Sequence, residues 1–411
     1  MTSRMISSQT KTRNPERTDL KTSLTCRNFG LCGGCSYLDI PYDEELSLKE
    51  EHVLSSLKAG LGDTEVQWEW EGVVPSPHRY GYRNKMEFTF GDERKGGPLT
   101  LGLHRKKSWF DVLDADECRI CDSDFTDIVK AVREAAVSFG MTKYDRKSHR
   151  GFLRHLIVRK AFHTGEVMAC IVTTSEPGFD LGAVTDRLRE LPLQGTLKGV
   201  LHIINDSLGD AVKEDGRELL FGCDHITERI MGLDFRITPF SFFQANSEAA
   251  ALMYEKAVEY AAGIGHSVVY DLYSGTGIIG QIMSRTADRV YGIEIVPEAV
   301  EAAKENAGMN GIENCSFLCG DVLEKMYELK DRPDVIVLDP PRNGVHPKAL
   351  PHLLSMGAPY VLCISCRIES LERDMPVFLE HGYRPVRASA YDLFPTTPNI
   401  ETLCLFGNGT G

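Results

Sequence analysis

The sequence predicts an α/β protein in which a mainly antiparallel α+β sheet domain precedes a doubly wound, mostly parallel sheet. Short alternating apolar segments, broken by Gly and Pro, run from about residue 73 to 231 and include MEFTF, HLIVRKAF and VMACIVTT. From about residue 244, helices alternate with the strands VVYDLY, VYGIEI, CSFLCG, DVIVLD and YVLCIS. Such alternation specifies a parallel sheet covered by helices, and 411 residues suffice for two or three domains.

The chain is expected to divide into a disordered tail over residues 1–25, a first domain over 26–232 and a second domain over 233–411. The tail is rich in Ser, Thr, Arg and Lys and lacks the apolar stretch of a secretory signal. No apolar run approaches the roughly 20 residues that span a bilayer. We therefore expect a cytoplasmic monomer with no membrane partner, whose twelve cysteines are thiols.

The net charge of −13 argues weakly against a nucleic-acid partner, but the basic residues are unevenly distributed. Residues 79–107 contain eight Lys and Arg against three acids, and residues 143–160 contain seven against one. These two basic islands are a candidate face for a polyanion. The alternative is that they are solvated strand edges that discourage aggregation.

A glycine-rich turn follows the first strand of the predicted parallel sheet. Gly275, Gly277 and Gly280 complete a G-x-G-x-x-G pattern, and Glu294 ends the next strand. Glycine allows close approach of the backbone to a nucleotide, and the acid accepts hydrogen bonds from ribose hydroxyl groups. This pattern fits NAD as well as S-adenosylmethionine.

The later loops favour a methyltransferase. The third strand leads to Gly320-Asp321, and the fourth ends in Asp339-Pro340-Pro341-Arg342. Adenine amino-methyltransferases carry an aromatic residue after Asp-Pro-Pro, whereas Arg342 stands here. The loop therefore looks like that of a methyltransferase that does not act on an exocyclic amine.

A thiol and a carboxylate are expected at the same sheet edge. Cys366 follows the fifth strand, and a Pro-rich turn places Glu401 at the start of the last strand. Cys363 has the opposite strand parity and is expected in the core. Methylation of C5 of uracil requires a thiolate that adds to C6 and a base that removes the C5 proton.

The chain resembles the RNA uracil-5-methyltransferase family from Cys26 to about Leu405. The segments FSFFQAN, DLYSGTG, GIE, DPPRNGVHPK and ISC and the turn before Glu401 occur in the order of that family. The resemblance implies a Rossmann-like class I methyltransferase domain and methyl transfer from S-adenosylmethionine to C5 of a uridine in structured RNA. It implies Cys366 as nucleophile, Glu401 as base, and a cofactor and uracil site lined by Gln244, Tyr273, Gly275, Gly277, Glu294, Asp321 and Asp339.

Two departures from the family concern substrate contacts. The nucleophile is usually followed by Asn-Pro, but here by Arg367-Ile368, and the usual histidines of the last turn are replaced by Thr397 and Asn399. The resemblance favours 23S rRNA as substrate, with a tRNA uridine as the alternative. A dinucleotide-binding oxidoreductase and a non-catalytic RNA-binding protein are the rival interpretations.

A cysteine-rich segment, CRNFGLCGGC, opens the first domain. Cys26, Cys32 and Cys35 have five and then two residues between them, and Cys118 lies far downstream. Spacing alone leaves zinc and an iron-sulfur cluster open. The resemblance implies a 4Fe-4S cluster on these four thiols, with Cys121 as a rival fourth ligand.

RNA contacts are expected on the first domain. YRNKMEFTF and FLRHLIVRK resemble family segments that carry phosphate-binding Arg83, Lys85 and Arg154 beside the aromatic residues Tyr82, Phe88 and Phe152. Because a uracil in folded RNA is stacked, the enzyme must read a loop or extrude the base.

Overall fold

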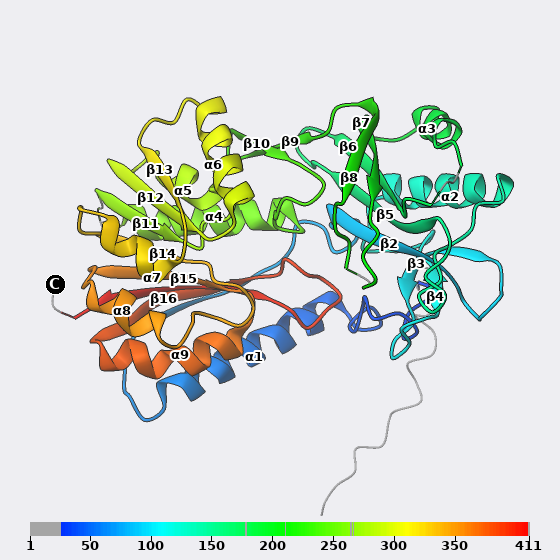
Figure 1. Cartoon of the computed structure of the whole chain (residues 1–411). Coiled ribbons are helices and arrows are strands. Elements are labelled where there is room, and N and C mark those ends of the chain that lie inside the picture. The colour runs from blue at the N-terminus through cyan, green and yellow to red at the C-terminus, as the bar shows by residue number, and fades with distance from the viewer. Residues whose placement is uncertain (1–25, 177–178, 210, 264, 266, 410–411) are drawn as a thin grey trace, which may run out of the picture.

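The computed structural model contains two large sheets, one in each half of the chain (Figure 1). The predicted fold class is confirmed, since an eight-stranded, mostly parallel α/β sheet accompanies a seven-stranded, mainly antiparallel sheet. Among the described helices, none is long and apolar enough to cross a membrane. The predicted tail lies outside the described residues, which are 26–176, 179–209, 211–263, 265 and 267–409.

The eight-stranded sheet has the strand order β1-β16-β17-β15-β14-β11-β12-β13. Its central strands β11 to β15 pair in parallel, whereas β17 is antiparallel to both of its neighbours. Ligands of such sheets bind where the strand order reverses, here beside β11 and β14. The strands are β11 (Val268–Leu272), β12 (Arg289–Glu294), β13 (Cys315–Cys319), β14 (Val335–Leu338), β15 (Tyr360–Ser365), β16 (Tyr383–Tyr391) and β17 (Glu401–Asn408).

Helices cover both faces of this sheet (Figure 1). α4 and α5 pack on one face, and α1, α8 and α9 pack on the other. Each face therefore has its own apolar core, which fixes which side chains of a strand point to which helices. The helices are α1 (Tyr42–Leu61), α4 (Ser247–Ala262), α5 (Ile278–Met283), α6 (Pro297–Met309), α7 (Val322–Lys325), α8 (Ala349–Ser355) and α9 (Ile368–Glu380), with a 3-10 turn at Met326–Glu328.

The N-terminal part of the first predicted domain belongs structurally to the second. The strand β1 (Glu69–Val74) pairs in parallel with β16 and extends the eight-stranded sheet. Helix α1 packs closely against α9. A Cβ atom on Gly60 of α1 would lie only 2.8 Å from the Cβ atom of Met375. The division expected at residue 233 is therefore corrected for residues 42–74, because apolar Val53, Leu57 and Leu61 complete the core of the parallel sheet.

The antiparallel sheet has the order β4-β3-β2-β5-β6-β7-β8, with only β6 and β7 parallel. Helices α2 (Ser123–Ser138) and α3 (Gly182–Arg189) bury one of its faces. The strands are β2 (Lys85–Asp92), β3 (Leu99–His104), β4 (Val112–Asp114), β5 (Leu153–Lys160), β6 (Glu166–Thr173), β7 (Thr196–Ile204) and β8 (Gly216–Gly222).

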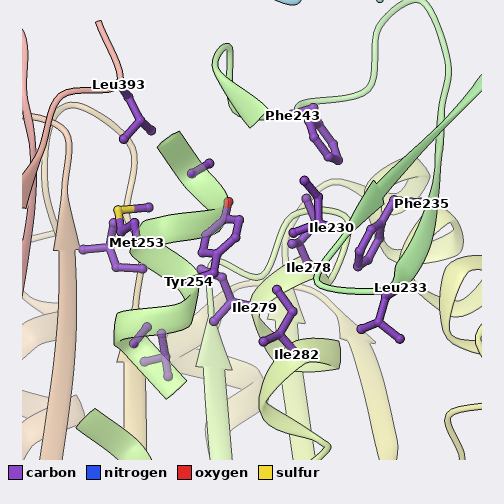
Figure 2. Close-up of a cluster of buried hydrophobic side chains, with 14 of the residues drawn as sticks. Ile230, Leu233, Phe235, Phe243, Met253, Tyr254, Ile278, Ile279, Ile282 and Leu393 are labelled. Atoms are coloured by element: carbon purple, nitrogen blue, oxygen red, sulfur yellow. The ribbon is translucent and has the colours of Figure 1, made fainter. Parts of the chain in front are cut away.

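The two sheets share one apolar core. A hairpin of β9 (Ile226–Ile230) and β10 (Leu233–Ile237) lies between them. Phe235 of this hairpin belongs to the same cluster as Met168 of β6 and Met253 of α4, and Figure 2 shows Phe235, Phe243 and Met253 in this cluster. This shared core fixes the antiparallel sheet relative to the cofactor edge of the parallel sheet.

Candidate active site

The glycine turn after β11 has the geometry of a nucleotide-binding loop. Tyr273, Gly275 and Gly277 all have positive φ, at 67°, 52° and 76°. A Cβ on Gly275 would meet no atom within 4 Å, whereas one on Gly277 would meet Phe317 at 2.7 Å. Gly275 therefore borders open space into which a ligand fits, and Gly277 permits close packing of the helix on the sheet.

The acid at the end of β12 is held against this turn. Glu294 accepts hydrogen bonds from the backbone amides of Gly275, at 3.0 Å, and Val296, at 2.9 Å. The buried Ser274 Oγ has no hydrogen-bond partner among the described residues. The fixed Glu294 carboxylate, beside the open space at Gly275, fits the ribose hydroxyl groups of S-adenosylmethionine.

The other predicted cofactor residues lie around the same edge, with different local roles. Asp321 follows β13 and caps α7, since its Oδ1 accepts from Leu323 N at 2.8 Å. Gln244 is buried, and its backbone carbonyl accepts from Asn84 Nδ2 at 2.8 Å. Asp339 follows β14 directly. The cap leaves one oxygen of Asp321 for an adenosine contact, and Asn84 connects the Gln244 segment to the antiparallel sheet.

Strand pairing brings Cys366 and Glu401 together. Ser365 pairs with Thr402 in the antiparallel ladder of β15 and β17, so the next residues toward the cofactor edge are Cys366 and Glu401. Both face the core that holds Ile364 and Leu403, whereas Cys363 is buried on the opposite face, as predicted.

The thiol and the carboxylate influence each other electrostatically. Burial, then the charges of Glu401 and Asp339, raise the pKa of Cys366 to about 11, and Arg342 opposes this. Burial and the charge of Asp339 raise the pKa of Glu401 to about 8, again opposed by Arg342. Glu401 is 1% exposed, and its Oε2 has no hydrogen-bond partner among the described residues. Burial and the neighbouring acids therefore disfavour both the thiolate of Cys366 and the carboxylate of Glu401, and Arg342 favours both.

Two further groups in this site were not predicted from the sequence. Asp271 on β11 accepts from Gly280 N at 2.8 Å, and burial raises its pKa to about 7. Tyr254 of α4 is buried, and burial together with the charges of Asp339, Glu401 and Asp271 raises its pKa. The sequence signal for Asp271 was its position in VVYDL, one residue before the strand end, where the side chain must face α4 and α5.

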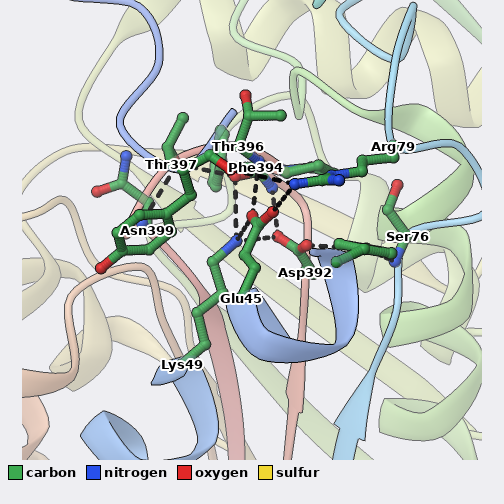
Figure 3. A network of polar contacts seen from close by, with 12 residues as sticks. Glu45, Lys49, Ser76, Arg79, Asp392, Phe394, Thr396, Thr397 and Asn399 are labelled. Atoms are coloured by element: carbon green, nitrogen blue, oxygen red, sulfur yellow. Dashed lines mark hydrogen bonds and ion pairs between the residues drawn. The ribbon is translucent and has the colours of Figure 1, made fainter. Parts of the chain in front are cut away.

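A buried ionic network holds the turn that precedes Glu401 (Figure 3). Lys49 Nζ donates to Glu45 at 2.8 Å, to Asp392 at 2.7 Å and to Phe394 O at 3.2 Å. Glu45 also accepts from Thr396 N at 2.6 Å. Removing one member of such a network leaves an unpaired buried charge, which costs roughly 3–5 kcal/mol. Helix α1 thus fixes the path of the turn into β17.

The cysteine-rich segment contacts the same turn. The amides of Ser36 and Tyr37 donate to Thr396 O at 2.8 and 2.9 Å, and Thr396 Oγ1 donates to Cys35 Sγ at 3.2 Å. Thr396 has a φ of 67°, which a non-glycine residue adopts only when its surroundings enforce it. The turn before Glu401 is therefore fixed from two sides, by α1 and by the cysteine-rich segment.

The four predicted ligand cysteines lie near one another. The pKa of Cys35 is raised to about 11 by burial and by the charges of Cys118, Cys32 and Cys26. Cys121 is buried, and its thiol donates to Cys118, whose pKa falls to about 7. Within the part of the chain that is described, no group of three or more His, Cys, Asp or Glu is arranged to hold a metal ion. The thiols thus share one neighbourhood without forming a closed coordination site.

The predicted RNA contacts divide into two groups. Arg83 and Lys85 are partly exposed, next to each other at the start of β2. Arg154, by contrast, is 3% exposed, and its guanidinium donates to the carbonyls of Asn205, Ser207 and Gly209 at 2.6–2.8 Å. The expected phosphate contact of Arg154 is corrected, because these carbonyls occupy its donors.

The aromatic residues expected beside the basic groups are also inside the protein. Tyr82, Phe88 and Phe152 all belong to the buried core beneath α2 and α3. Their rings cannot stack on RNA bases. Phe242, in the FSFFQAN segment two residues before Gln244, is 68% exposed and was not among the predicted RNA contacts.

The two departures from the family pattern are placed differently. Arg367 lies at the surface 3.5 Å from Glu369, and it precedes α9. Thr397 Oγ1 donates to Phe394 O at 2.8 Å and accepts from Asn399 N at 3.2 Å. Thr397 therefore stabilises the turn itself, and its short side chain reaches both of these partners.

Known proteins resemble this chain along most of its length. A family model described as a methyltransferase domain matches residues 265–374. An uncharacterized RNA methyltransferase of Clostridium acetobutylicum is 45% identical over 92% of this chain and 83% of its own length. Another of Caldanaerobacter subterraneus is 42% identical over 95% and 86%.

A solved structure has the same fold. The tRNA (uracil-54, C5)-methyltransferase of Pyrococcus abyssi, in complex with S-adenosyl-L-homocysteine, matches with a TM-score of 0.75 and 26% identity, over 92% of this chain and 86% of that one. The oxidoreductase interpretation is thereby wrong, because the relatives and the matched domain are methyltransferases. The chain belongs to the family of S-adenosylmethionine-dependent class I RNA methyltransferases, and its resemblance to the RNA uracil-5-methyltransferases is confirmed.

Proposed function

We propose that the protein methylates C5 of a uridine in 23S rRNA through a covalent adduct between Cys366 and C6 of the base. The observation that carries this proposal is the pairing of β15 with β17, which places a thiol beside a buried carboxylate at the cofactor edge. S-adenosylmethionine, held by Tyr273, Gly275, Glu294 and Asp321, supplies the methyl group.

Cys366 acts as the nucleophile. Its thiolate forms a bond to C6 of an extruded uridine, and the electron pair of the C5–C6 bond moves toward C5, which becomes the atom that accepts the methyl group. Arg342, whose charge lowers the pKa of Cys366, favours the thiolate. The negative charges of Glu401 and Asp339 oppose it, so ionisation of the thiol is easier when Glu401 is protonated.

Glu401 acts as the general base. Once C5 carries both the methyl group and a proton, the Glu401 carboxylate takes that proton, the C5–C6 double bond forms again and Cys366 leaves C6. A raised pKa makes the Glu401 carboxylate a stronger base than an exposed carboxylate.

A tRNA uridine is the second candidate substrate. It is favoured by the structure of the Pyrococcus abyssi tRNA (uracil-54, C5)-methyltransferase, which matches 92% of this chain. Mass spectrometry of 5-methyluridine at each rRNA and tRNA position, in a deletion strain and its parent, decides between them. We expect one 23S rRNA position to lose the methyl group. Loss at a tRNA position supports the second candidate, and no loss contradicts both.

We further propose that Cys26, Cys32, Cys35 and Cys118 bind a 4Fe-4S cluster with a structural role. The support is their shared neighbourhood and the contact of Cys35 with the turn before Glu401. Protein purified without oxygen should contain iron and sulfide near four per chain. A full equivalent of zinc without iron contradicts the cluster, and Cys121→Ala with unchanged iron excludes Cys121 as ligand.

RNA phosphates are proposed to meet Arg83 and Lys85. Lys85 pairs with Arg159 of β5 and lies on the sheet face opposite the helices α2 and α3, where the antiparallel sheet meets the methyltransferase domain. Burial and the charge of Arg159 lower the pKa of Lys85, and a phosphate nearby would favour its charged form.

A further inference from the structure

The loop between β3 and β4 exposes two neighbouring aromatic side chains. Trp109 is 75% exposed and Phe110 is 58% exposed. Large aromatic side chains are mostly buried in soluble domains, and adjacent exposed rings mark a surface that binds a partner. Neither ring takes part in the active site or in the core.

Hydrogen bonds order the backbone of the loop that carries these rings. Arg105 N donates to Asp111 O at 2.9 Å and closes the loop. Ser108 Oγ accepts from Phe110 N at 3.3 Å and from Asp111 N at 3.1 Å. Lys107 adopts the left-handed conformation with a φ of 66°. A surface that is ordered before binding loses less entropy when its ligand arrives.

Cationic side chains surround the rings. Lys147, from the turn that follows Tyr144, has its Nζ 5.3 Å from the centre of the Phe110 ring. Lys106 and Lys107 are exposed next to Trp109. Among the described residues, Lys106, Lys107 and Lys147 form no ion pair. Three acids of the same region pair with other cations: Glu93 and Asp111 with Arg105, and Asp92 with Lys143. The two basic islands of the sequence thus meet around a pair of aromatic rings.

The loop is connected to the catalytic turn through the cysteine-rich segment. Lys106 N donates to Leu31 O at 2.7 Å, and Cys32 forms a β-bridge with Arg105. The same segment reaches Thr396 through the amides of Ser36 and Tyr37. A ligand on the loop therefore has a defined position relative to Glu401.

We propose that Lys106, Lys107, Trp109, Phe110 and Lys147 form an RNA platform, on which unpaired bases stack while the lysines contact the flanking phosphates. Aromatic rings between unpaired cations are the arrangement that binds single strands, since every base has a face that can stack. The lysines complement a polyanion, although the whole chain carries a net charge of −13. The inference rests on the proposed function for its substrate class and adds the site that holds single-stranded RNA beside the target uridine.

The test uses the full chain and a fluorescein-labelled oligouridylate. The double variant Trp109→Ala with Phe110→Ala should weaken binding about tenfold or more, because each stacked base is lost. Lys106→Ala with Lys107→Ala should reduce the slope of log K against log salt by about 1.4, since two phosphate contacts disappear. Because these side chains are exposed, both double variants should have the melting temperature of the wild type.

A matched control is Phe139→Ala. Phe139 is 40% exposed and lies 5.7 Å from the Arg187 guanidinium, so it is also an exposed ring beneath a cation, but at the end of α2. Its oligouridylate affinity should equal that of the wild type. Unchanged affinity and salt slope in the platform variants, or an equal loss in Phe139→Ala, overturn the platform.

The outcomes separate the platform from the proposed function. RNA binding that depends on the platform, in a wild-type enzyme that forms no 5-methyluridine, supports the platform and contradicts the proposed function. Normal formation of 5-methyluridine with an unchanged KM in the platform variants supports the function and contradicts the platform. A raised KM with an unchanged kcat supports both.

Discussion

We expect that replacing Cys366 by alanine abolishes methyl transfer to RNA. C5 of uracil is not nucleophilic enough to take a methyl group until a thiolate has added to C6, and the alanine side chain cannot form that bond. Turnover should fall by a factor on the order of 10⁴ or more, as when an enzyme loses its nucleophile. Transfer of a radioactive methyl group from S-adenosylmethionine to unmodified RNA measures this loss, with the product identified as 5-methyluridine.

The control for this change is Cys363→Ala. Cys363 lies within β15, three residues before Cys366, but its side chain packs in the core with residues of α9, away from the proposed site. It should retain most of the activity. An active Cys366→Ala enzyme contradicts the covalent route. A wild type that binds RNA without methyl transfer supports the alternative of a non-catalytic RNA-binding protein.

The site could be predicted from the sequence where chain geometry decides it. Parallel strands all end at one edge, so the residues after β11, β12, β14 and β15 had to meet there. The parity of β15 separates Cys363 from Cys366 in the same way. These predictions depend on local periodicity, which a single sequence displays directly.

Burial of charged residues could not be predicted in this way. The sequence predicts Arg154 at the surface, but its buried guanidinium donates hydrogen bonds to carbonyl groups within residues 205–209. Lys49 lies in a segment rich in charged residues, yet its side chain is buried, and one of its partners, Asp392, is 343 residues away. Glu45 lies only four residues before Lys49, but burial of the pair depends on Asp392, and the partners of Arg154 are also distant along the chain, so the sequence carries no local signal for the burial.

That residues 69–74 belong to the parallel sheet could not be predicted for a related reason. A strand that joins the far edge of a sheet in parallel, next to β16, forms contacts with residues more than 300 positions later. A six-residue strand with the sequence EWEGVV does not indicate to which sheet it belongs. The same holds for Trp109 and Phe110, because an apolar residue in a loop gives no sign of whether its ring is exposed.

We expect that replacing Glu401 by glutamine traps the enzyme on its RNA. Glutamine keeps the shape of the side chain but cannot take the C5 proton, so the methylated base stays bonded to Cys366. Multiple turnover should fall by a factor on the order of 10³ or more, while one equivalent of RNA becomes covalently bound. The adduct appears as a band that resists denaturation, and it requires S-adenosylmethionine. Glu369→Gln, an exposed acid near Cys366 that pairs with Arg367, is the control and should form no stable adduct.

The same variant changes two properties that need no turnover. The charge of Glu401 raises the pKa of Cys366. In Glu401→Gln, iodoacetamide should therefore alkylate Cys366 at lower pH. The folded protein is alkylated, and the modified peptide that contains Cys366 is then quantified after digestion. The folded-state pKa of Glu401 is raised from 4.5 to about 8, so its stabilising contribution is complete below pH 4.5 and is lost as pH rises through 8. Glutamine does not titrate, so the melting temperature of Glu401→Gln should exceed that of the wild type by a few degrees at pH 9 and match it more closely at pH 5. A wild type that is as stable at pH 9 as the variant, with an unaltered alkylation profile, contradicts a buried acid beside the thiol, and with it the base that the reaction needs.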